Sequence, residues 1–104
     1  MASTTVIMFP GMLSSQKDAN AAAQQICDKL KFQAEQQAGR KFGIFTAKFY
    51  KTHTMGIGIV FIKVHVGGGQ YAHLRIYQKQ PGDPNPELKG IQYPKTLDDH
   101  IVIF

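Results

Sequence analysis

The sequence has no tryptophan, a single cysteine and no long apolar run. The lone cysteine, Cys27, excludes an internal disulfide, as is usual in proteins of reducing compartments. No stretch approaches the roughly 20 apolar residues that span a bilayer. The opening residues, MASTTVIMFPG, have neither the basic start nor the apolar length of a signal peptide. We therefore predict a cytoplasmic protein with no membrane partner.

Charge of one sign is not concentrated in any segment. Twelve Lys and Arg against seven Asp and Glu give a net charge of +5, but the basic residues are scattered along the chain. Nucleic-acid-binding proteins gather such residues in a patch or stripe, so we predict no nucleic-acid partner. The 104 residues, 43% hydrophobic and 18% charged, are typical of one globular domain spanning residues 1–104.

Recognisable catalytic motifs are also missing. The chain contains no nucleophile elbow, P-loop, Rossmann fingerprint or Cys-x-x-Cys. Cys27 lies beside Ile26 at the edge of an apolar helical stripe, which favours a partly buried structural thiol. Asp98 and Asp99 indicate a solvated turn, and His53 has no acid or base partner near it in sequence. We therefore predict neither an enzyme nor a bound cofactor.

One segment, residues 14–41, has a helical pattern. Ser14 or Ser15 is a suitable N-cap, Asp18 suits the first turn, and Gly39 is a natural stop. Apolar residues recur at spacings of three and four and form one narrow stripe: Ala19, Ala22, Ala23, Ile26, Leu30 and Ala34. A stripe rich in alanine allows the helix to lie close against a sheet.

The rest of the chain has the alternation and the composition of strands. The expected strand segments are residues 41–52, 59–66, 71–78, 88–93 and 100–104. A glycine turn, GGGQ, and a proline-rich loop, QPGDPNP, separate three of them. The pattern predicts an α+β fold in which one long helix packs on a four- or five-stranded antiparallel sheet.

Alternation in the segments 59–66 and 71–78 also predicts their register. Pairing Val66 with Ala72 places apolar residues opposite one another on the helix-facing side. The outer face then has two opposed pairs: His65 with His73, and Lys63 with Arg75. Paired histidines are potential metal ligands, but solvent-facing histidines beside like charges are the more common arrangement. We predict no metal site.

Three segments interrupt this plan with glycine, proline and apolar residues: FPGML at 9–13, HTMGIG at 53–58 and QPG at 80–82. Alternate hairpin tips of an antiparallel meander lie at one end of the sheet, so 53–58 and 80–82 should emerge at the same edge. The N-terminal segment can join them there. Exposed apolar residues at one edge indicate a docking surface.

These segments resemble the type 1 cystatins, or stefins, which are intracellular inhibitors of papain-like cysteine proteases. The resemblance rests on PGML, on ICDKLK in the helix, on the stretch from Tyr50 to Gly82, and on the tail IQYPKTLDDHIVIF. It implies the cystatin fold, in which the sheet wraps around the helix. It also implies reversible, tight-binding inhibition of cathepsins of the B, H, L and S type by a monomer.

The family's mechanism implies a wedge made of the N-terminal trunk and two hairpin loops. The wedge fills the protease cleft on either side of the catalytic cysteine and offers no peptide bond for cleavage. Matching positions imply these protease-binding residues: Pro10, Gly11, Met12, His53, Thr54, Met55, Gly56, Ile57, Gln80, Pro81 and Gly82.

The first loop departs from the family motif Gln-x-Val-x-Gly. An ungapped comparison puts His53, Met55 and Ile57 at the three defining positions, and the glycines stand at 56 and 58 instead. If the motif glycine needs a positive φ, isoleucine is strained at position 57. The loop can instead use Gly56 or Gly58, with a bulge to absorb the slip.

The second loop departs at Gln80, where the family usually has an apolar residue, whereas Pro81 and Gly82 match. Two alternatives to inhibition stay open. One is a cystatin-fold protein with weakened or lost inhibition that binds another partner. The other is a self-associating protein whose long, glycine-rich hairpin exchanges between copies to form a domain-swapped dimer.

Overall fold

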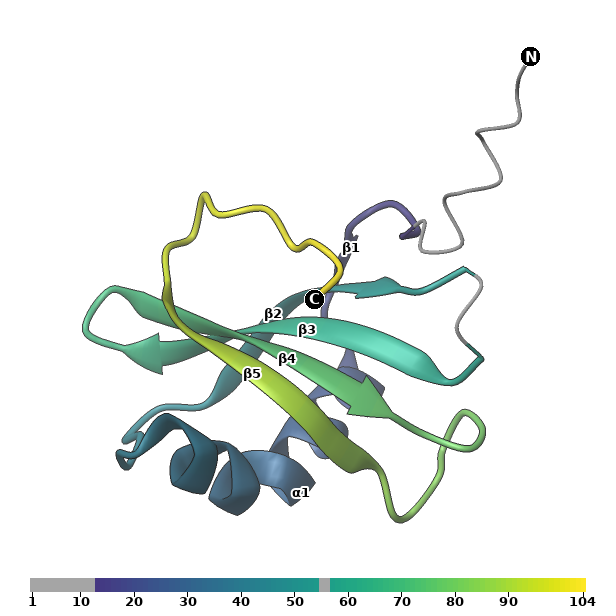
Figure 1. The fold of residues 1–104 in the computed structure, drawn as a ribbon, viewed down its shortest axis with the longest axis horizontal. Helices are drawn as coiled ribbons and strands as arrows, with labels where there is room; N and C mark the ends of the chain where they lie inside the picture. The colour runs from purple at the N-terminus through teal and green to yellow at the C-terminus, as the bar shows by residue number, and fades with distance from the viewer. Residues whose placement is uncertain (1–12, 55–56) are drawn as a thin grey trace.

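The computed structural model describes residues 13–54 and 57–104. In these residues the chain forms β1 (Lys17–Asp18), α1 (Ala21–Ala38), β2 (Thr46–Thr52), β3 (Ile59–Gly67), β4 (Gln70–Tyr77) and β5 (Glu87–Lys95). The strands form one antiparallel sheet in chain order, and α1 lies along one face of it (Figure 1). The predicted α+β architecture is therefore confirmed. No helix in the described ranges is both long enough and apolar enough to span a bilayer.

The helix starts later than the sequence predicts. Its N-cap is Asn20, whose side-chain oxygen accepts a 2.9 Å hydrogen bond from the third helical N–H. The predicted caps, Ser14 and Ser15, were wrong, and Asp18 lies in β1 instead of the first helical turn. Ser14 pairs with Thr52 of β2 through its backbone N–H and its hydroxyl. These bonds hold Ser14 against the edge of the sheet, so the helix cannot begin at this residue.

The helix end and most of its buried stripe follow the prediction. Gly39 has φ +75° and donates its N–H to the Glu35 carbonyl, which ends the helix. The helical side chains buried against the sheet are Ala23, Cys27, Leu30 and Ala34. Cys27 is central in this stripe and fully buried, so its predicted position at the edge was wrong, and Ala22 is exposed. Burial raises the pKa of the Cys27 thiol to about 12.

The core lies between α1 and the inner face of β3 and β4. The strands contribute alternate apolar residues to it: Val60, Ile62, Val64, Ala72, Leu74 and Ile76. The predicted pairing of Val66 with Ala72 was wrong by two residues, because Val64 lies opposite Ala72. Gly67 pairs with Gln70 across two glycines of positive φ, and a register shift after His65 takes up one extra residue of β3. An even shift keeps each side chain on its predicted face, so the core is preserved.

The outer face of the sheet differs most from the prediction. The even shift places Lys63 opposite His73 and His65 opposite Tyr71, so the predicted His65–His73 and Lys63–Arg75 pairs were wrong. His73 and Lys63 are buried, not solvent-facing. The segment 96–104, which includes the strand predicted at 100–104, forms no strand in this structure. It lies over the sheet on the side away from α1, where it ends the chain in yellow (Figure 1).

Candidate functional site

The β2–β3 and β4–β5 loops lie at the same end of the sheet, as predicted (Figure 1). The Gln78 N–H donates a 2.9 Å hydrogen bond to the Gly58 carbonyl and joins the two hairpins where they leave the sheet. We call the described residues of these two loops, 53–54, 57–58 and 78–83, the rim. The rim is thus one connected surface built by two hairpins that are separate in sequence.

Gly58 is the residue that lets the hairpins approach so closely. Its φ is +81°, and a Cβ at this position would lie 2.3 Å from the Gln78 carbonyl oxygen and 2.9 Å from the Tyr77 ring. All positive-φ residues in the described ranges are glycines, so Ile57 does not have a positive φ. Of the two glycines that the sequence offered, Gly58 takes this conformation in the structure, and Gly56 lies outside the described residues.

The tip of the first loop presents an apolar side chain to solvent. Ile57 is 90% exposed, the largest exposure among the large hydrophobic residues that the structure describes. Thr54 is also exposed. His53 donates its backbone N–H to the Ile59 carbonyl at 3.1 Å, so it belongs to the hairpin stem, and its Nδ1 is buried without a hydrogen-bond partner.

The chain before β1 reaches the rim at His53. Leu13 forms an isolated antiparallel bridge with His53, and the next residue, Ser14, is bonded to Thr52. Leu13 and Ser14 therefore lie beside the first hairpin, and the rest of the predicted segment 9–13 lies outside the described residues. Five of the predicted site residues lie outside the described residues: Pro10, Gly11, Met12, Met55 and Gly56.

The second loop is a tight turn that holds Pro81 and Gly82 at the surface. The Asp83 N–H donates to the Gln80 carbonyl at 3.0 Å, and Gly82 has φ +81°. Proline followed by a glycine of positive φ is the signature of a type II turn. Gln80, Pro81 and Gly82 are all exposed.

Asp83 stabilises this turn and is not among the site residues that the sequence predicts. Its carboxylate accepts hydrogen bonds from the N–H groups of Lys79, at 2.8 Å, and Asn85, at 2.9 Å. These bonds, from Lys79 first, lower the pKa of Asp83. An aspartate beside prolines and an asparagine is a known signal for such side-chain-to-backbone turns. Gln78 had no sequence signal, because its contribution comes from its backbone.

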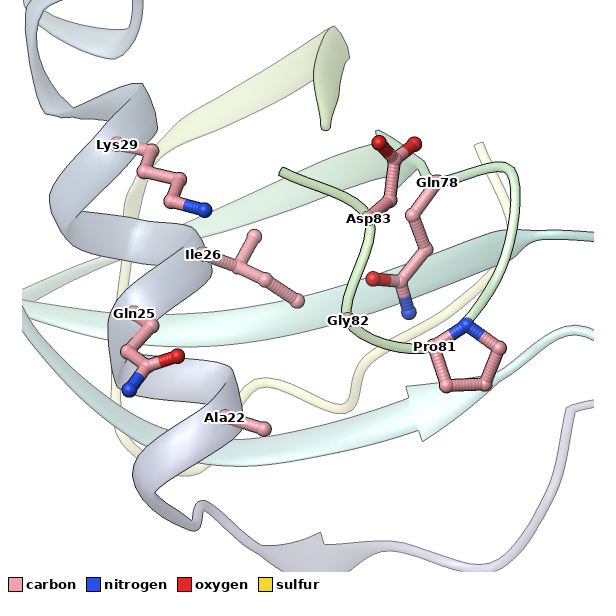
Figure 2. A pocket seen from close by; sticks show the side chains of 8 residues that line it. All are labelled: Ala22, Gln25, Ile26, Lys29, Gln78, Pro81, Gly82 and Asp83. Atoms are coloured by element: carbon pink, nitrogen blue, oxygen red, sulfur yellow. The ribbon is translucent and has the colours of Figure 1, made fainter. Parts of the chain in front are cut away.

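Behind the second loop, a small pocket separates it from the first half of α1 (Figure 2). Ala22, Gln25, Ile26 and Lys29 line it from the helix, and residues Gln78 and 81–83 line it from the loop. Lys29 Nζ donates to the Pro84 carbonyl at 3.3 Å and links the two sides. The Lys29 and Asp83 hydrogen bonds therefore hold the loop beside this pocket.

The predicted residues that the structure describes gather at the rim: His53, Thr54, Ile57, Gln80, Pro81 and Gly82. A shallow groove between the two loops is lined by His53 and Ile57 on one side and by Gln80 and Pro81 on the other. Within 13–54 and 57–104, no group of three or more His, Cys, Asp or Glu side chains converges to hold a metal ion. The rim therefore offers a partner a shaped surface with an exposed apolar side chain.

Comparison with known proteins found relatives along almost the whole chain. The chain is 43% identical over 98 residues to a protein named Cystatin-B from Oplegnathus fasciatus, which covers 93% of this chain and 98% of the relative. It is 39% identical over 97 residues to Cystatin-A from Mus musculus, covering 93% and 100% of the two chains. It is 35% identical over 98 residues to Leukocyte cysteine proteinase inhibitor 1 from Sus scrofa, covering 93% and 95%. No protein-family model matches the chain.

Proposed function

This chain belongs to the type 1 cystatins, or stefins, a family of cysteine protease inhibitors and not of enzymes, and we propose that it inhibits papain-like proteases reversibly and tightly. The observation that carries the proposal is the joined rim. Leu13 is tied to the first loop at His53, and the first loop is tied to the second through Gly58 and Gln78. Three segments that are distant in sequence therefore present one edge to a partner.

A preformed rim suits inhibition because it limits the entropy lost on binding. The hairpin stems, the Gly58–Gln78 bond and the Asp83 turn order the described residues of the rim before a protease arrives. Ile57 is almost fully exposed, and burial of such a side chain in a cleft contributes roughly 1.5–3 kcal/mol. The rim as a whole enters the protease cleft as a wedge on either side of the catalytic cysteine.

The proposed contacts include residues on both loops and on the trunk. From the described residues they are His53, Thr54, Ile57, Gln80, Pro81 and Gly82. Pro10, Gly11, Met12, Met55 and Gly56 complete the set as proposed contacts outside the described residues. The proposed partners are cathepsins of the B, H, L and S type, met by a cytoplasmic protein that is a monomer and that can exchange its first hairpin into a domain-swapped dimer.

The test is a titration of papain and of an L-type cathepsin with the full-length protein, following hydrolysis of a fluorogenic peptide. We expect inhibition constants in the nanomolar range or below. No inhibition at micromolar protein would refute the proposal. Size-exclusion chromatography over a concentration series measures the monomer and dimer populations in the same preparation.

A second candidate function follows from the altered first loop. Ile57 stands where the family motif has glycine, and its side chain projects from the tip with 90% exposure. Such a side chain hinders entry into a cleft shaped for glycine, so the alternative is a cystatin-fold binding protein with weakened inhibition. Replacing residues 53–57 by the family motif separates the two. Stronger inhibition by the rewritten loop favours the alternative, whereas unchanged or weaker inhibition means that the native loop suits its protease.

A further inference from the structure

A row of polar side chains crosses the outer face of the sheet, on the side away from α1. Lys63 on β3 lies opposite His73 on β4, and His73 lies opposite Gln92 on β5. Lys63 is 1% exposed and His73 is fully buried. Both ring nitrogens of His73 and the Gln92 side-chain oxygen lack a hydrogen-bond partner. Unsatisfied polar groups at this depth are rare in native proteins, so these atoms need a structural or functional explanation.

The row is covered by residues 96–104, which we call the C-terminal cover. Lys63 Nζ donates to three carbonyls of this segment, those of Thr96 at 3.1 Å, Leu97 at 2.5 Å and Asp99 at 2.6 Å. An ammonium has three N–H donors, so the cover satisfies Lys63 completely. The cover thereby compensates the burial of a charge that would otherwise be costly.

Further contacts hold the end of the cover. Lys51 Nζ donates to the Ile101 carbonyl at 3.2 Å, and Arg75 donates to the Phe104 carbonyl. The Phe104 ring packs edge-on against Phe61 of β3, with centroids 5.4 Å apart. Most of these bonds run from cations of the sheet to backbone carbonyls of the cover. An additional positive charge beneath the cover would therefore repel the cations that hold these carbonyls.

His73 is the group that can add this charge. Burial first, and then the Lys63 ammonium, lower the pKa of His73 to about 4. The charged groups that face it are Lys63 on β3, Lys51 on β2, Lys95 on β5 and Asp99 in the cover. Three cations oppose one carboxylate, so the site disfavours an imidazolium while the cover is closed. Arg75 adds a fourth cation on the same strand as His73, and its side chain contacts the cover.

We propose that the C-terminal cover is an acid-sensitive latch: protonation of His73 beside the Lys63 ammonium releases residues 96–104 from the sheet while the core beneath α1 stays folded. Opening admits water to the imidazolium and removes the burial that opposed its charge. It also exposes Phe61 and Ile101, each 1% exposed in the closed form. Only the acidic form thus has a released C-terminal segment and an exposed apolar surface on the outer face of the sheet.

The direction of the pH dependence follows from the sign of the shift. The pKa of His73 is lower in the closed form than the ordinary value of 6.5, so closure is at full strength above pH 6.5. The closing constant falls as the pH drops below 6.5, and the contribution of neutral His73 to closure is completely lost below pH 4. A pKa displaced from 6.5 to about 4 corresponds to a closing constant reduced by up to about 300-fold.

The test is a pH titration of the full-length protein by ¹H–¹³C NMR between pH 7.5 and 3.5. We expect the methyl signals of Ile101, Val102 and Ile103 to shift with the same midpoint as the His73 ring, between about pH 4 and 6.5. Methyl signals of Ile62 and Leu30, which are both buried in the core beneath α1, should stay in place. Cover and core signals that move together, or cover signals that do not follow the His73 ring, overturn the proposal.

Four variants sharpen the test. His73→Phe removes the titrating group and keeps a ring, and His73→Gln serves the same purpose if phenylalanine overpacks the site. Either variant should keep the cover closed down to pH 4, and a wild-type transition in a folded variant refutes the role of His73. His100→Gln is the matched control, because His100 lies in the cover but is exposed, and it should leave the midpoint unchanged. Lys63→Met should loosen the cover at every pH.

Discussion

The Gly58 carbonyl accepts the Gln78 N–H at 2.9 Å, and no side chain fits at position 58 without displacing the Gln78 backbone. Two hairpins therefore meet through backbone atoms at the rim. Because hydrogen bonds between backbone groups do not depend on flexible side chains, the spacing between the loops is a property of the sheet itself. A wedge that enters a narrow cleft depends on such spacing.

Gly58→Ala should destabilise the protein and weaken inhibition together. The alanine has to tolerate a positive φ, at about 1–2 kcal/mol, and it also collides with Gln78. The matched control is Gly68→Ala in the β3–β4 turn, because Gly68 has φ +63° but open space around a Cβ. Urea unfolding should give a larger loss for Gly58→Ala, and only this variant should raise the inhibition constant. Equal losses with unchanged inhibition would contradict a role for the Gly58–Gln78 contact.

Ile57→Ala tests whether the exposed tip enters the protease. Removing most of this side chain from a buried contact loses roughly 1–2 kcal/mol, which corresponds to a rise of about 5- to 30-fold in the inhibition constant. Folding stability should not change, because Ile57 is 90% exposed in the free protein. Ile44→Ala is the matched control, since Ile44 is 45% exposed and lies against Gly67 at the opposite end of the sheet. The inhibition constant should rise for Ile57→Ala and stay unchanged for Ile44→Ala. A tighter complex with Ile57→Ala would favour the weakened-inhibitor alternative.

Deletion of residues 1–11 tests the trunk. Leu13 and Ser14 remain and keep the Leu13–His53 bridge and the bonds to Thr52, so the urea midpoint should stay close to that of the full chain. The inhibition constant should rise, mainly through faster dissociation, because one of three contact segments is lost. Stopped-flow or surface-immobilised protease measures both rates. Unchanged rates exclude the trunk from the contact.

Cys27 should behave as an inert part of the core. Because burial raises the pKa of its thiol to about 12, the thiolate is scarce at neutral pH, and a thiol reagent should react slowly with the native protein. Reaction should become fast in denaturing urea. Cys27→Ser places a hydroxyl in the apolar stripe and should cost about 1–3 kcal/mol in stability, with inhibition unchanged. Cys27→Ala is the control for lost volume, and rapid native labelling would argue against the buried position.

Much of the site could be predicted from local residue types. Pro81 and Gly82 encode their turn directly, because proline sets one φ and glycine permits the next. The displaced glycines of the first loop limited the position with a positive φ to residue 56 or residue 58. The sequence did not predict the partner of Gly58, because a close approach between two hairpins depends on their packing in three dimensions.

The sequence by itself determined the helix, the strands β2 to β5 and the core-facing side of β3 and β4, although the strand predicted at 100–104 did not form. Side-chain direction repeats every two residues in a strand and about every 3.6 in a helix. Leu30 therefore lies on the apolar face of the helix, and Ile62 points to the core in the predicted register and in any register that differs from it by an even number of residues. Gly39 ended the helix for a local reason too, because glycine adopts the positive φ of the helix end without strain.

Only the tertiary structure decided where the helix begins, how β3 and β4 are paired, and what covers the outer face. Ser14 bonds Thr52, so Asn20 becomes the cap. The alternation around Lys63 has the same pattern whether that face meets water or protein. The C-terminal cover buries it because three backbone carbonyls, more than 30 residues away in sequence, satisfy one ammonium, and such a long-range match leaves no local signal.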